Sequence, residues 1–430
     1  MWTTQNKVLP GAYINFISVA SADAKLSERG YATMPLELDW GPDGEIFTVT
    51  ADDFKTRALN IFGYDYMSEK LKGLRDLFMY AQTLYAYRLN SGDKATCTYA
   101  DAKYSGTRGN DLKVVITKNV DDQARFDVTD YLGTTKINVQ TVASAAELKD
   151  DDFIIWKKDA TLAVTASTSL SGGTNGTINT QAYQTYLDLA ENYSFNTMGI
   201  VTTDEEIKKL CVNYVKRLRD DVGVKFQLVL HKSPSDYEGV INIKNSTTDT
   251  GWTEASAVYW LTGAEAGCAV NASLTNKKYD GEFAIGGDYT QTQLAGAIKA
   301  GELTFHRVGT EIRVLEDINS FVSFTDDKNE LFCDNQTIRV IDQIATVHDD
   351  AVLFNTKYLG KVPNDEGGRI SLWNDFVKSR KALLKIRAIE DFSDSDIVVS
   401  QGDTKKSVYV TQQITVVNAM THLYMTVKVV

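Results

Sequence analysis

The stretch that decides the predicted fold is Lys103-Tyr-Ser-Gly-Thr-Arg-Gly-Asn-Asp-Leu-Lys-Val-Val-Ile-Thr117. Two glycines, Gly106 and Gly109, flank a polar turn, and an alternating segment follows over residues 112–117. Glycine, asparagine and aspartate favour tight turns because they tolerate backbone conformations that other residues avoid. The alternation is typical of a half-buried strand. The stretch therefore predicts a tight turn that leads into a strand, a pattern that any β-domain can contain.

A second strand pattern lies near the start of the sequence, in Val8-Leu-Pro-Gly-Ala-Tyr-Ile-Asn-Phe-Ile17. The Pro10-Gly11 pair interrupts regular structure, and the residues after it alternate between two faces. We assign this alternating segment to a terminal arm, and its residues are Ala12, Tyr13, Ile14, Asn15 and Phe16.

The last residues of the sequence show the same alternation. Val408 and Val410 belong to one strand-like segment over residues 407–417, and a second follows over residues 421–430. The apolar positions of the second segment are Leu423, Met425, Val427 and Val429. The sequence thus ends in predicted strand, which we assign to a second arm.

Two interpretations of these terminal strands are open. Terminal residues fray unless a sheet holds them, and an unpaired strand is a liability that proteins usually protect. The strands therefore either pair within their own domain or add to the sheets of neighbouring subunits by β-augmentation.

The composition is that of an acidic globular protein with several domains. At 430 residues the chain exceeds one ordinary hydrophobic core, so about two to four domains are expected. Its 43% of hydrophobic and 24% of charged residues are ordinary values. The formal charge of −12 argues against nucleic acid as a partner, because non-specific binding needs a basic surface.

We expect neither membrane insertion nor secretion. The sequence has no run of about eighteen apolar residues, and residues 1–7 lack the apolar region of a signal peptide. The cysteines lie far apart, which favours reduced cytoplasmic thiols over a zinc site or a disulfide framework. They are Cys97, Cys211, Cys268 and Cys333.

Shifts in pattern along the chain predict an α/β and α+β multidomain fold. We expect an α/β core with a mixed sheet, an inserted β-sandwich and a C-terminal α+β domain with extended terminal strand arms. The predicted parts are an N-terminal arm (1–20), an N-terminal α/β part of the core (21–95), a β-sandwich insertion (96–176), the α/β core domain (177–305), a C-terminal α+β domain (306–406) and a C-terminal strand arm (407–430).

The patterns do not indicate catalysis. The histidines do not stand at metal-binding helix spacing with another histidine or a carboxylate, and we expect structural or surface roles for them. A nucleophile elbow is absent, and no dinucleotide fingerprint follows the predicted strand over 197–201. Acidic clusters at 150–152 and 349–350 could supply the paired carboxylates of a glycosidase, but a solvated acidic surface explains them more simply. We therefore expect no enzyme, no cofactor and no metal site.

One basic segment stands out in this acidic chain. A predicted helix over residues 370–387 carries Lys378, Arg380, Lys381, Lys385 and Arg387. Lys378, Lys381 and Lys385 are three and four residues apart, so they share one helix face. This face is either simply solvated, with cations that complement the helix dipole, or a docking surface for an acidic partner.

Taken together, these features resemble the contractile tail sheath proteins of phages, phage-like bacteriocins and related injection machines. The resemblance covers the N-terminal arm, the turn at 106–111, the stretch Ala264–Gly281 and the whole C-terminal unit. The order and spacing of these motifs carry it, since no single motif is diagnostic.

The resemblance implies a structural subunit that polymerises helically around an inner tube and contracts to drive the tube through a target envelope. It implies arms that link neighbouring subunits, and a basic helix, with Lys378, Lys381 and Lys385, that docks on the tube. The implied partners are other copies of the chain, the inner tail tube protein, and baseplate and terminator proteins. Assembly is expected in the cytoplasm of a host bacterium, before the subunit becomes part of a virion or bacteriocin particle.

Two other functions remain open on the sequence alone. One is an α/β hydrolase-like enzyme with a carbohydrate-binding β-sandwich. The other is a different virion structural protein, of capsid or baseplate, that exchanges arms in a similar way.

Overall fold

The computed structural model describes residues 29–345 and 350–429, and these fall into two compact units. The first unit comprises residues 29–345 and 418–429, and the second comprises residues 350–417. Each unit is described by itself below.

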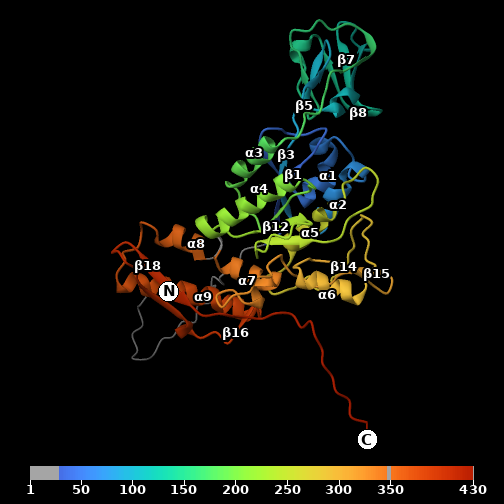
Figure 1. Ribbon diagram of the computed structural model, residues 1–430. Helices are drawn as coiled ribbons and strands as arrows, with labels where there is room; N and C mark the ends of the chain where they lie inside the picture. The colour runs from blue at the N-terminus through green and yellow to red at the C-terminus, as the bar shows by residue number, and fades with distance from the viewer. Residues whose placement is uncertain (1–28, 346–349, 430) are drawn as a thin grey trace, which may run out of the picture. The chain divides into compact units, whose positions relative to one another are not determined.

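A six-stranded mixed sheet forms the centre of the first unit (Figure 1). The strand order is β13-β12-β11-β1-β3-β2, and every neighbouring pair is parallel except β2 and β3. The strands are β1 (Tyr31–Leu36), β2 (Ile46–Thr50), β3 (Thr83–Arg88), β11 (Thr197–Gly199), β12 (Gln227–His231) and β13 (Val240–Ile243). This is the α/β core with a mixed sheet that the sequence predicts.

Helices cover both faces of this sheet, and each face has its own hydrophobic cluster. One cluster joins the sheet to α1 (Ala51–Phe62), α2 (Lys72–Phe78) and α5 (Ala257–Gly267). The other joins it to α3 (Thr180–Ala190) and α4 (Glu205–Lys216). Strands buried on both faces read as nearly continuous apolar runs, as β12 does.

Polar side chains set where these helices begin. The side chain of Asp204 accepts from the backbone N–H of Glu206 at 2.8 Å and starts α4, as the sequence predicts. Asn179 starts α3 by accepting from the N–H of Ala182 at 2.9 Å. Such caps satisfy backbone donors that have no partner within the helix.

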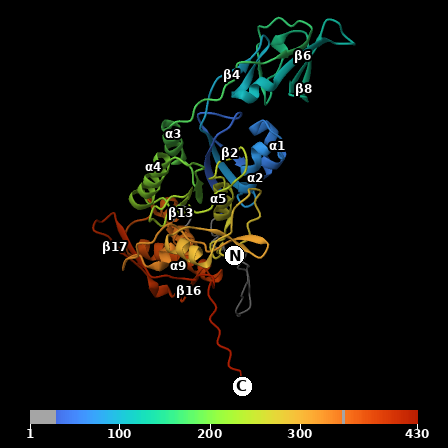
Figure 2. The ribbon, with the colours of Figure 1, turned by 45° about the vertical axis from the view of Figure 1, so that its right-hand side comes forward.

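The β-sandwich is inserted between β3 and α3 and consists of two antiparallel sheets (Figure 2). A four-stranded sheet has the order β10-β6-β7-β8, and a three-stranded sheet has the order β4-β5-β9. The strands are β4 (Lys94–Thr96), β5 (Ala100–Ser105), β6 (Leu112–Lys118), β7 (Phe126–Leu132), β8 (Thr135–Val142), β9 (Ile154–Trp156) and β10 (Thr165–Ser169). A separate hydrophobic cluster fills the space between the two sheets.

The first unit ends with smaller elements. They are α6 (Gln291–Lys299), the hairpin β14 (Phe305–Val308) and β15 (Glu311–Val314), and α7 (Asn335–Ala345). The predicted hairpin around Gly309 is confirmed, and the φ of 62° at this glycine explains the residue choice.

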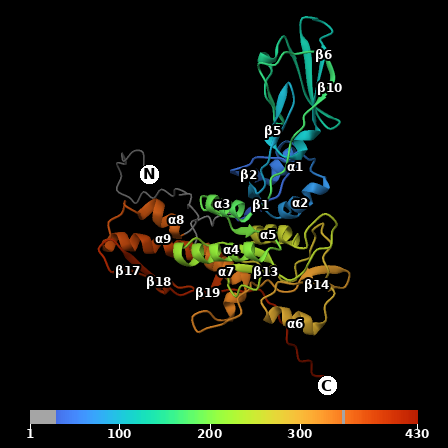
Figure 3. The same ribbon diagram turned by 45° about the horizontal axis from the view of Figure 1, so that its top comes forward.

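The second unit is an α+β fold built around one long helix (Figure 3). Its helices are α8 (Asp350–Leu353) and α9 (Glu366–Lys385). Its strands form two antiparallel pairs, β16 (Ile389–Glu390) with β19 (Thr415–Val416) and β17 (Ile397–Gln401) with β18 (Val408–Gln412). The predicted fold class, with its mixed sheet, inserted sandwich and C-terminal α+β part, is thus confirmed.

The turn at residues 106–111 depends on a close approach of two backbones. Gly106 has a φ of 119°, and a Cβ atom at this position would lie only 2.1 Å from the carbonyl oxygen of Asp39. Asp39 lies outside the sandwich sheets, so this contact holds the turn against the core. The glycine is therefore required by space as well as by backbone conformation.

We expect Gly106→Ala to destabilise the connection between the core and the sandwich by roughly 1–3 kcal/mol, because alanine strains the backbone there and collides with Asp39. The matched control is Gly133→Ala, at a φ of 61° with no atom within 4 Å of the added Cβ. Thermal unfolding and limited proteolysis of residues 90–95 and 170–176 measure the effect. Equal destabilisation by the two variants would show that the close approach is unimportant.

Candidate functional site

The turn at 106–111 and the two segments that enter and leave the sandwich form one hydrogen-bonded neck, defined here as residues 91–93, 106–111 and 171–176. The side-chain amide of Asn110 donates to the carbonyl of Gly173 at 2.8 Å, and its oxygen accepts from the Gly173 N–H at 2.8 Å. The backbone N–H of Thr107 donates to Asn175 Oδ1 at 3.0 Å. The sequence predicts the turn, and the structure shows in addition that the exit segment is hydrogen-bonded to it.

Arg108 joins the neck to the core of the first unit. Its Nε donates to the carbonyl of Gly63 at 2.8 Å, and its Nη1 pairs with Asp111 at 2.7 Å. The guanidinium also lies 4.5 Å from the centre of the Tyr64 ring, which is an attractive cation–π geometry. The neck is therefore anchored by specific polar contacts rather than by chain connectivity alone.

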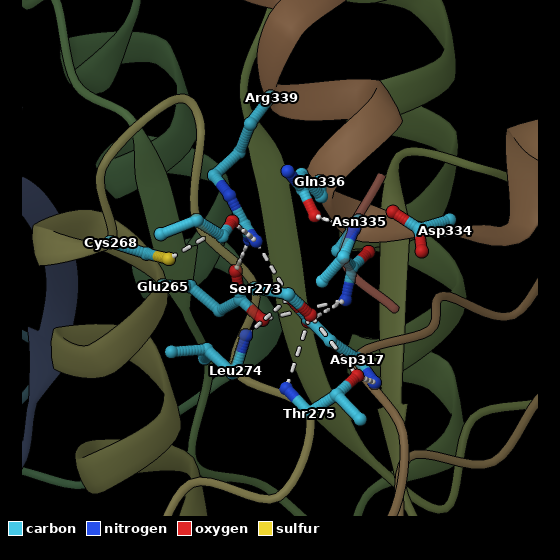
Figure 4. A network of polar contacts seen from close by, with 12 residues as sticks. Glu265, Cys268, Ser273, Leu274, Thr275, Asp317, Asp334, Asn335, Gln336 and Arg339 are labelled. Atoms are coloured by element: carbon cyan, nitrogen blue, oxygen red, sulfur yellow. Dashed lines mark hydrogen bonds and ion pairs between the residues drawn. The ribbon is translucent and has the colours of Figure 1, made fainter. Parts of the chain in front are cut away.

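A second polar cluster lies where α7 meets the core, and it is fully buried. Figure 4 shows Arg339 of α7 reaching toward two carboxylates, Glu265 of α5 and Asp317. Arg339 Nη1 donates to Glu265, and Arg339 Nη2 donates to Asp317 at 2.6 Å and to the carbonyl of Ala272 at 2.8 Å. The three charged side chains are at most 1% exposed.

Asp317 connects this ion cluster to the chain around it. It accepts from the Leu274 N–H at 2.9 Å and from Asn335 Nδ2 at 2.9 Å, and its own N–H donates to Thr275 Oγ1 at 3.0 Å (Figure 4). Leu274 and Thr275 belong to the stretch 264–281 that carried part of the family resemblance. The cluster shows why this stretch is polar: its backbone and hydroxyl groups hold a buried carboxylate.

The two carboxylates of the cluster have opposite protonation preferences. Burial, followed by the negative charge of Asp317, raises the pKa of Glu265 well above its usual range. Burial also opposes ionisation of Asp317, but the charge of Arg339 and several hydrogen bonds outweigh it and lower the pKa. Asp317 is thus the ionised partner of the guanidinium, and the pKa of Arg339 is raised in turn.

A second buried ion pair holds α7 at Asp342, about one turn after Arg339. Arg219, in the π-helical turn Arg217–Val222 after α4, donates to both oxygens of Asp342 at 2.6 and 2.8 Å. The Arg219 and Asp342 side chains are 4% and 8% exposed. Such a two-pronged geometry is directional as well as strong. Two ion pairs on neighbouring turns therefore fix the helix to the core.

Helix α7 in turn holds Asn418 and Ala419, the two residues at which the last segment leaves the fold and which are called its root below. Asn418 Nδ2 donates to Thr337 Oγ1 at 2.9 Å, and the Ala419 N–H donates to Gln336 Oε1 at 3.0 Å. Beyond this root, residues 420–429 form no regular strand within the described chain. Their apolar side chains are 73–94% exposed: Leu423, Met425, Val427 and Val429.

The other predicted arm residues have different placements. Ala12, Tyr13, Ile14, Asn15 and Phe16 lie outside the described residues. Val408 and Val410 lie in β18 and pair with Gln401 and Val399 of β17 in the same chain, where they pack on the hydrophobic cluster of α9. They are therefore part of their own fold and not of an extended segment, because a hairpin partner lies next to them in sequence.

The predicted basic helix exists as α9, but its cations do not all face solvent. Lys378, Lys381 and Lys385 share an exposed face. Arg380 is buried, where it binds Asp350 and donates to Gln412 Oε1 at 2.9 Å. Counting Arg380 with the surface charges is thus a misinterpretation, because it serves as an internal ion-pair partner.

Acidic neighbours reduce the charge of this lysine face. Lys381 pairs with Asp394 at 2.8 Å, and Lys378 lies 3.9 Å from Asp375. Within the described ranges, Lys385 has no carboxylate at ion-pair distance. The face carries a local positive charge with one lysine that is not neutralised by the fold.

The described residues contain no group of three or more histidine, cysteine or acidic side chains that could hold a metal ion. Of the helices in the same ranges, none combines the length and apolarity that a membrane span requires. His231 is buried, and burial lowers its pKa to about 4, so this histidine is neutral at physiological pH.

Comparison with known proteins identifies the family. The sequence matches family models for the phage tail sheath protein central domain over residues 176–320, the tail sheath C-terminal domain over 327–430 and the tail sheath beta-sandwich domain over 90–175. Residues 29–89 match the N-terminal region of domain III of tail sheath protein Gp18.

Individual proteins agree with this assignment. The crystal structure of a sheath tail protein from Desulfitobacterium hafniense is 36% identical with a TM-score of 0.82, over 96% of this chain and 98% of that chain. The phage-like element PBSX protein XkdK of Bacillus subtilis is 29% identical over 99% of this chain and 98% of its own length. The helical sheath of the anti-feeding prophage in its contracted state shares the fold, with 11% identity and a TM-score of 0.59 over 98% of this chain and 99% of that chain.

The chain belongs to the phage tail sheath family. It is a structural subunit of a contractile tail sheath and not an enzyme, so the hydrolase alternative is not favoured. The resemblance recognised in the sequence is confirmed.

The buried ion cluster is the feature that sequence reasoning missed. Its only local signal is the presence of Arg339 and Asp342 within the apolar pattern of a predicted helix, where charged side chains at core-facing positions indicate internal partners. The partners themselves are distant in sequence and have no local signature.

We expect Arg339→Met to destabilise the first unit by about 3–5 kcal/mol, because it leaves Asp317 as a buried charge without its partner. Arg307→Ala, which removes the exposed pair with Asp288, is the control and should change stability little. Chemical denaturation of both variants measures the difference. If the two substitutions had similar effects, the cluster would not be a main support of the fold.

Proposed function

We propose that the chain polymerises into a helical sheath around an inner tube, and that its terminal segments link neighbouring subunits by main-chain hydrogen bonds. One observation carries this proposal: an alternating apolar segment, residues 421–429, leaves an anchored root and stays exposed in the isolated chain. Burying each such apolar side chain in a neighbour gains about 1.5–3 kcal/mol. Burial of a few of these side chains would therefore stabilise each contact between subunits substantially.

We propose that the sheets of the second unit accept these segments. The pairs β17–β18 and β16–β19 are each two-stranded, so each has outer edges that the described chain leaves without a strand. Edges of this kind invite a further strand. We therefore assign Val408 and Val410 to the accepting sheet, while residues 12–16 and 421–429 are the donated strands.

A third part of the proposal concerns the tube. The face formed by Lys378, Lys381 and Lys385 docks on an acidic surface of the inner tube protein. Each exposed contact is weak, roughly 0.2–1 kcal/mol, so the summed contact over many subunits holds the tube while single contacts still release it. The support is the exposed local positive charge in a chain whose formal charge is −12.

The remaining assignments follow the same scheme. We propose the division into an arm (1–20), a core (21–95 and 177–305), a sandwich insertion (96–176) and a C-terminal domain (306–406), with the sandwich peripheral to the lattice. Of the predicted second arm (407–430), residues 407–417 complete the accepting sheets and residues 421–430 form the arm itself. Baseplate and terminator proteins would contact the ends of the polymer. The four cysteines are free thiols, which is compatible with assembly in a reducing host cytoplasm.

Removal of residues 421–430 should leave a folded, soluble protein that does not form long tubes, because the apolar strand is lost while its root remains. A sharper variant replaces Leu423, Met425 and Val427 with serine, and its matched control replaces Tyr424, Thr426 and Lys428, which lie on the alternate positions, with serine. Sedimentation and electron microscopy compare assembly.

The first triple variant should assemble poorly and its control should assemble nearly as well as the wild type. Normal tubes from the truncated protein would refute the arm proposal. Unfolding of the truncated protein would instead assign the segment to its own core.

Replacement of Lys378, Lys381 and Lys385 with glutamate should reduce co-sedimentation with the inner tube and leave the monomer folded. The defect should be largest at low salt, where charges are screened least. A control with the same change in net charge replaces Lys94, Lys118 and Lys136, which are exposed on the sandwich. Tube binding equal to that of the wild type at low ionic strength would rule out electrostatic docking by α9.

A further inference from the structure

The interior of the β-sandwich contains a carboxyl group that the sheath function does not explain. Asp130 lies in β7 between Val128 and Leu132, and all three side chains are buried, with Asp130 only 1% exposed. Alternation along the strand places the three on one face, and Val128 and Leu132 belong to the hydrophobic cluster of the sandwich. A carboxylate in an apolar core is strongly unfavourable unless it is paired or hydrogen-bonded.

Within the described ranges, this carboxyl group accepts no hydrogen bond, although Asn138 opposite it carries an amide group. Among the described residues, neither side-chain oxygen of Asp130 has a hydrogen-bond partner. Asp151, which precedes β9, contributes a third buried oxygen without a partner, its Oδ2. Its Oδ1 accepts from the backbone N–H groups of Phe153 at 2.8 Å and Ile154 at 2.9 Å. Asp130 and Asp151, the aspartate pair, thus expose three unsatisfied acceptors to the sandwich interior.

The cations on the strands next to β7 do not reach the aspartate pair. Lys118 of β6 is opposite Phe126, on the face of Asp130 but four residues away along the strand, and its ammonium group lies 3.7 Å from the centre of the Phe126 ring. Val114 of β6 and Asn138 of β8 are the register partners of Asp130. Lys113 and Lys136, on the same two strands, are instead opposite Tyr131, whose side chain lies on the other face of β7. Lys113 stacks over the Tyr131 ring at 5.4 Å.

The segment before β9 brings no cation to the aspartate pair either. Lys158 pairs with Asp150 at 3.1 Å, and Lys103 of β5 pairs with Asp152 at 3.2 Å. Both acidic neighbours of Asp151 are therefore engaged with lysines elsewhere. Asp151 is the one charged group that acts on Asp130 in the described structure.

We propose that Asp130 carries a proton in the folded sandwich and donates it to Asp151 in a hydrogen bond, and that this proton makes the β-sandwich a pH-dependent module, stable at mildly acidic pH and weakened at alkaline pH. A protonated carboxyl group donates one O–H and still accepts. One proton therefore supplies the missing donor and removes one of two like charges at the same time. This property concerns the sandwich alone and is independent of arms and tube docking.

The direction of the pH effect follows from the pKa of Asp130 in the folded chain and in the unfolded chain. Burial, followed by the charge of Asp151, raises the pKa of Asp130 to about 7. In an unfolded chain an aspartate has a pKa of about 3.9. The stabilisation is therefore fully present below about pH 4 and is lost as the pH rises through about 7, because the folded sandwich must then bury a second negative charge.

The test uses the full chain and the substitution Asp130→Asn, which puts a donor beside Asp151 and does not titrate. Hydrogen exchange of peptides from residues 112–132, corrected for intrinsic rates, is compared at about pH 5 and about pH 9. In the wild type, the equilibrium constant for opening of this segment should increase at least about tenfold at the higher pH. The reason is that each unit by which folding raises a pKa corresponds to a tenfold change in that equilibrium constant. In D130N the increase should largely disappear.

Two further variants keep the test decisive. Asp127→Asn, on the opposite face of β7, is the control and should keep the wild-type pH response. Asp151→Asn should flatten the response as D130N does, which covers the case that D130N does not fold. An equal pH response in the wild type and both Asn variants of the pair would overturn the proposal. A second result would also overturn it. If calcium stabilised the wild type at alkaline pH and did not stabilise D130N, a cation and not a proton would occupy the aspartate pair.

Discussion

The buried guanidinium of Arg339 is the constraint on which the arrangement of the first unit depends. It draws α5, the loop at 273–275 and α7 to one point, and it supplies the positive charge opposite the buried, ionised Asp317. Removing the guanidinium is costly because Asp317 would stay buried and charged. The clamp at Arg219 and Asp342 fixes the same helix a second time. As a result, Gln336 and Thr337 sit at fixed positions, and the last residues leave the fold from a defined root.

A core held together by buried ion pairs and a C-terminal segment with exposed apolar side chains together suit a subunit of a polymer. The core buries its polar groups in ion pairs and caps, and the neck ties the sandwich to the core through Gly106, Arg108 and Asn110. The last residues, in contrast, expose a row of apolar side chains that the isolated chain does not cover. Exposed apolar rows of this kind mark interaction surfaces in soluble proteins. Rigid domains joined by such segments can repack against one another while the links persist, which is the behaviour that we infer for contraction.

The sequence predicted local features well and long-range partners poorly. The turn before β6 follows from residue types and spacing, and the structure confirms it. The cap of α4 and the hairpin around Gly309 are local in the same way, because each depends on residues that are close in sequence. Arg380 and Arg339 show the limit: periodicity places a charged residue on a helix, but whether it meets solvent or a buried carboxylate depends on segments far away in sequence. Val408 and Val410 show another limit, because alternation predicts a strand without naming its partner. The family was recognisable because the order of several weak motifs is more specific than any one of them.

The central claim is that the subunit forms a helical sheath in which the last residues pair with a neighbour. Electron cryomicroscopy of the purified protein assembled with its inner tube tests this most directly. The account predicts helical tubes in which the density of residues 421–430 continues a two-stranded sheet of an adjacent subunit. Discrete particles that never form tubes, or tubes in which these residues fold back onto their own subunit, would contradict it.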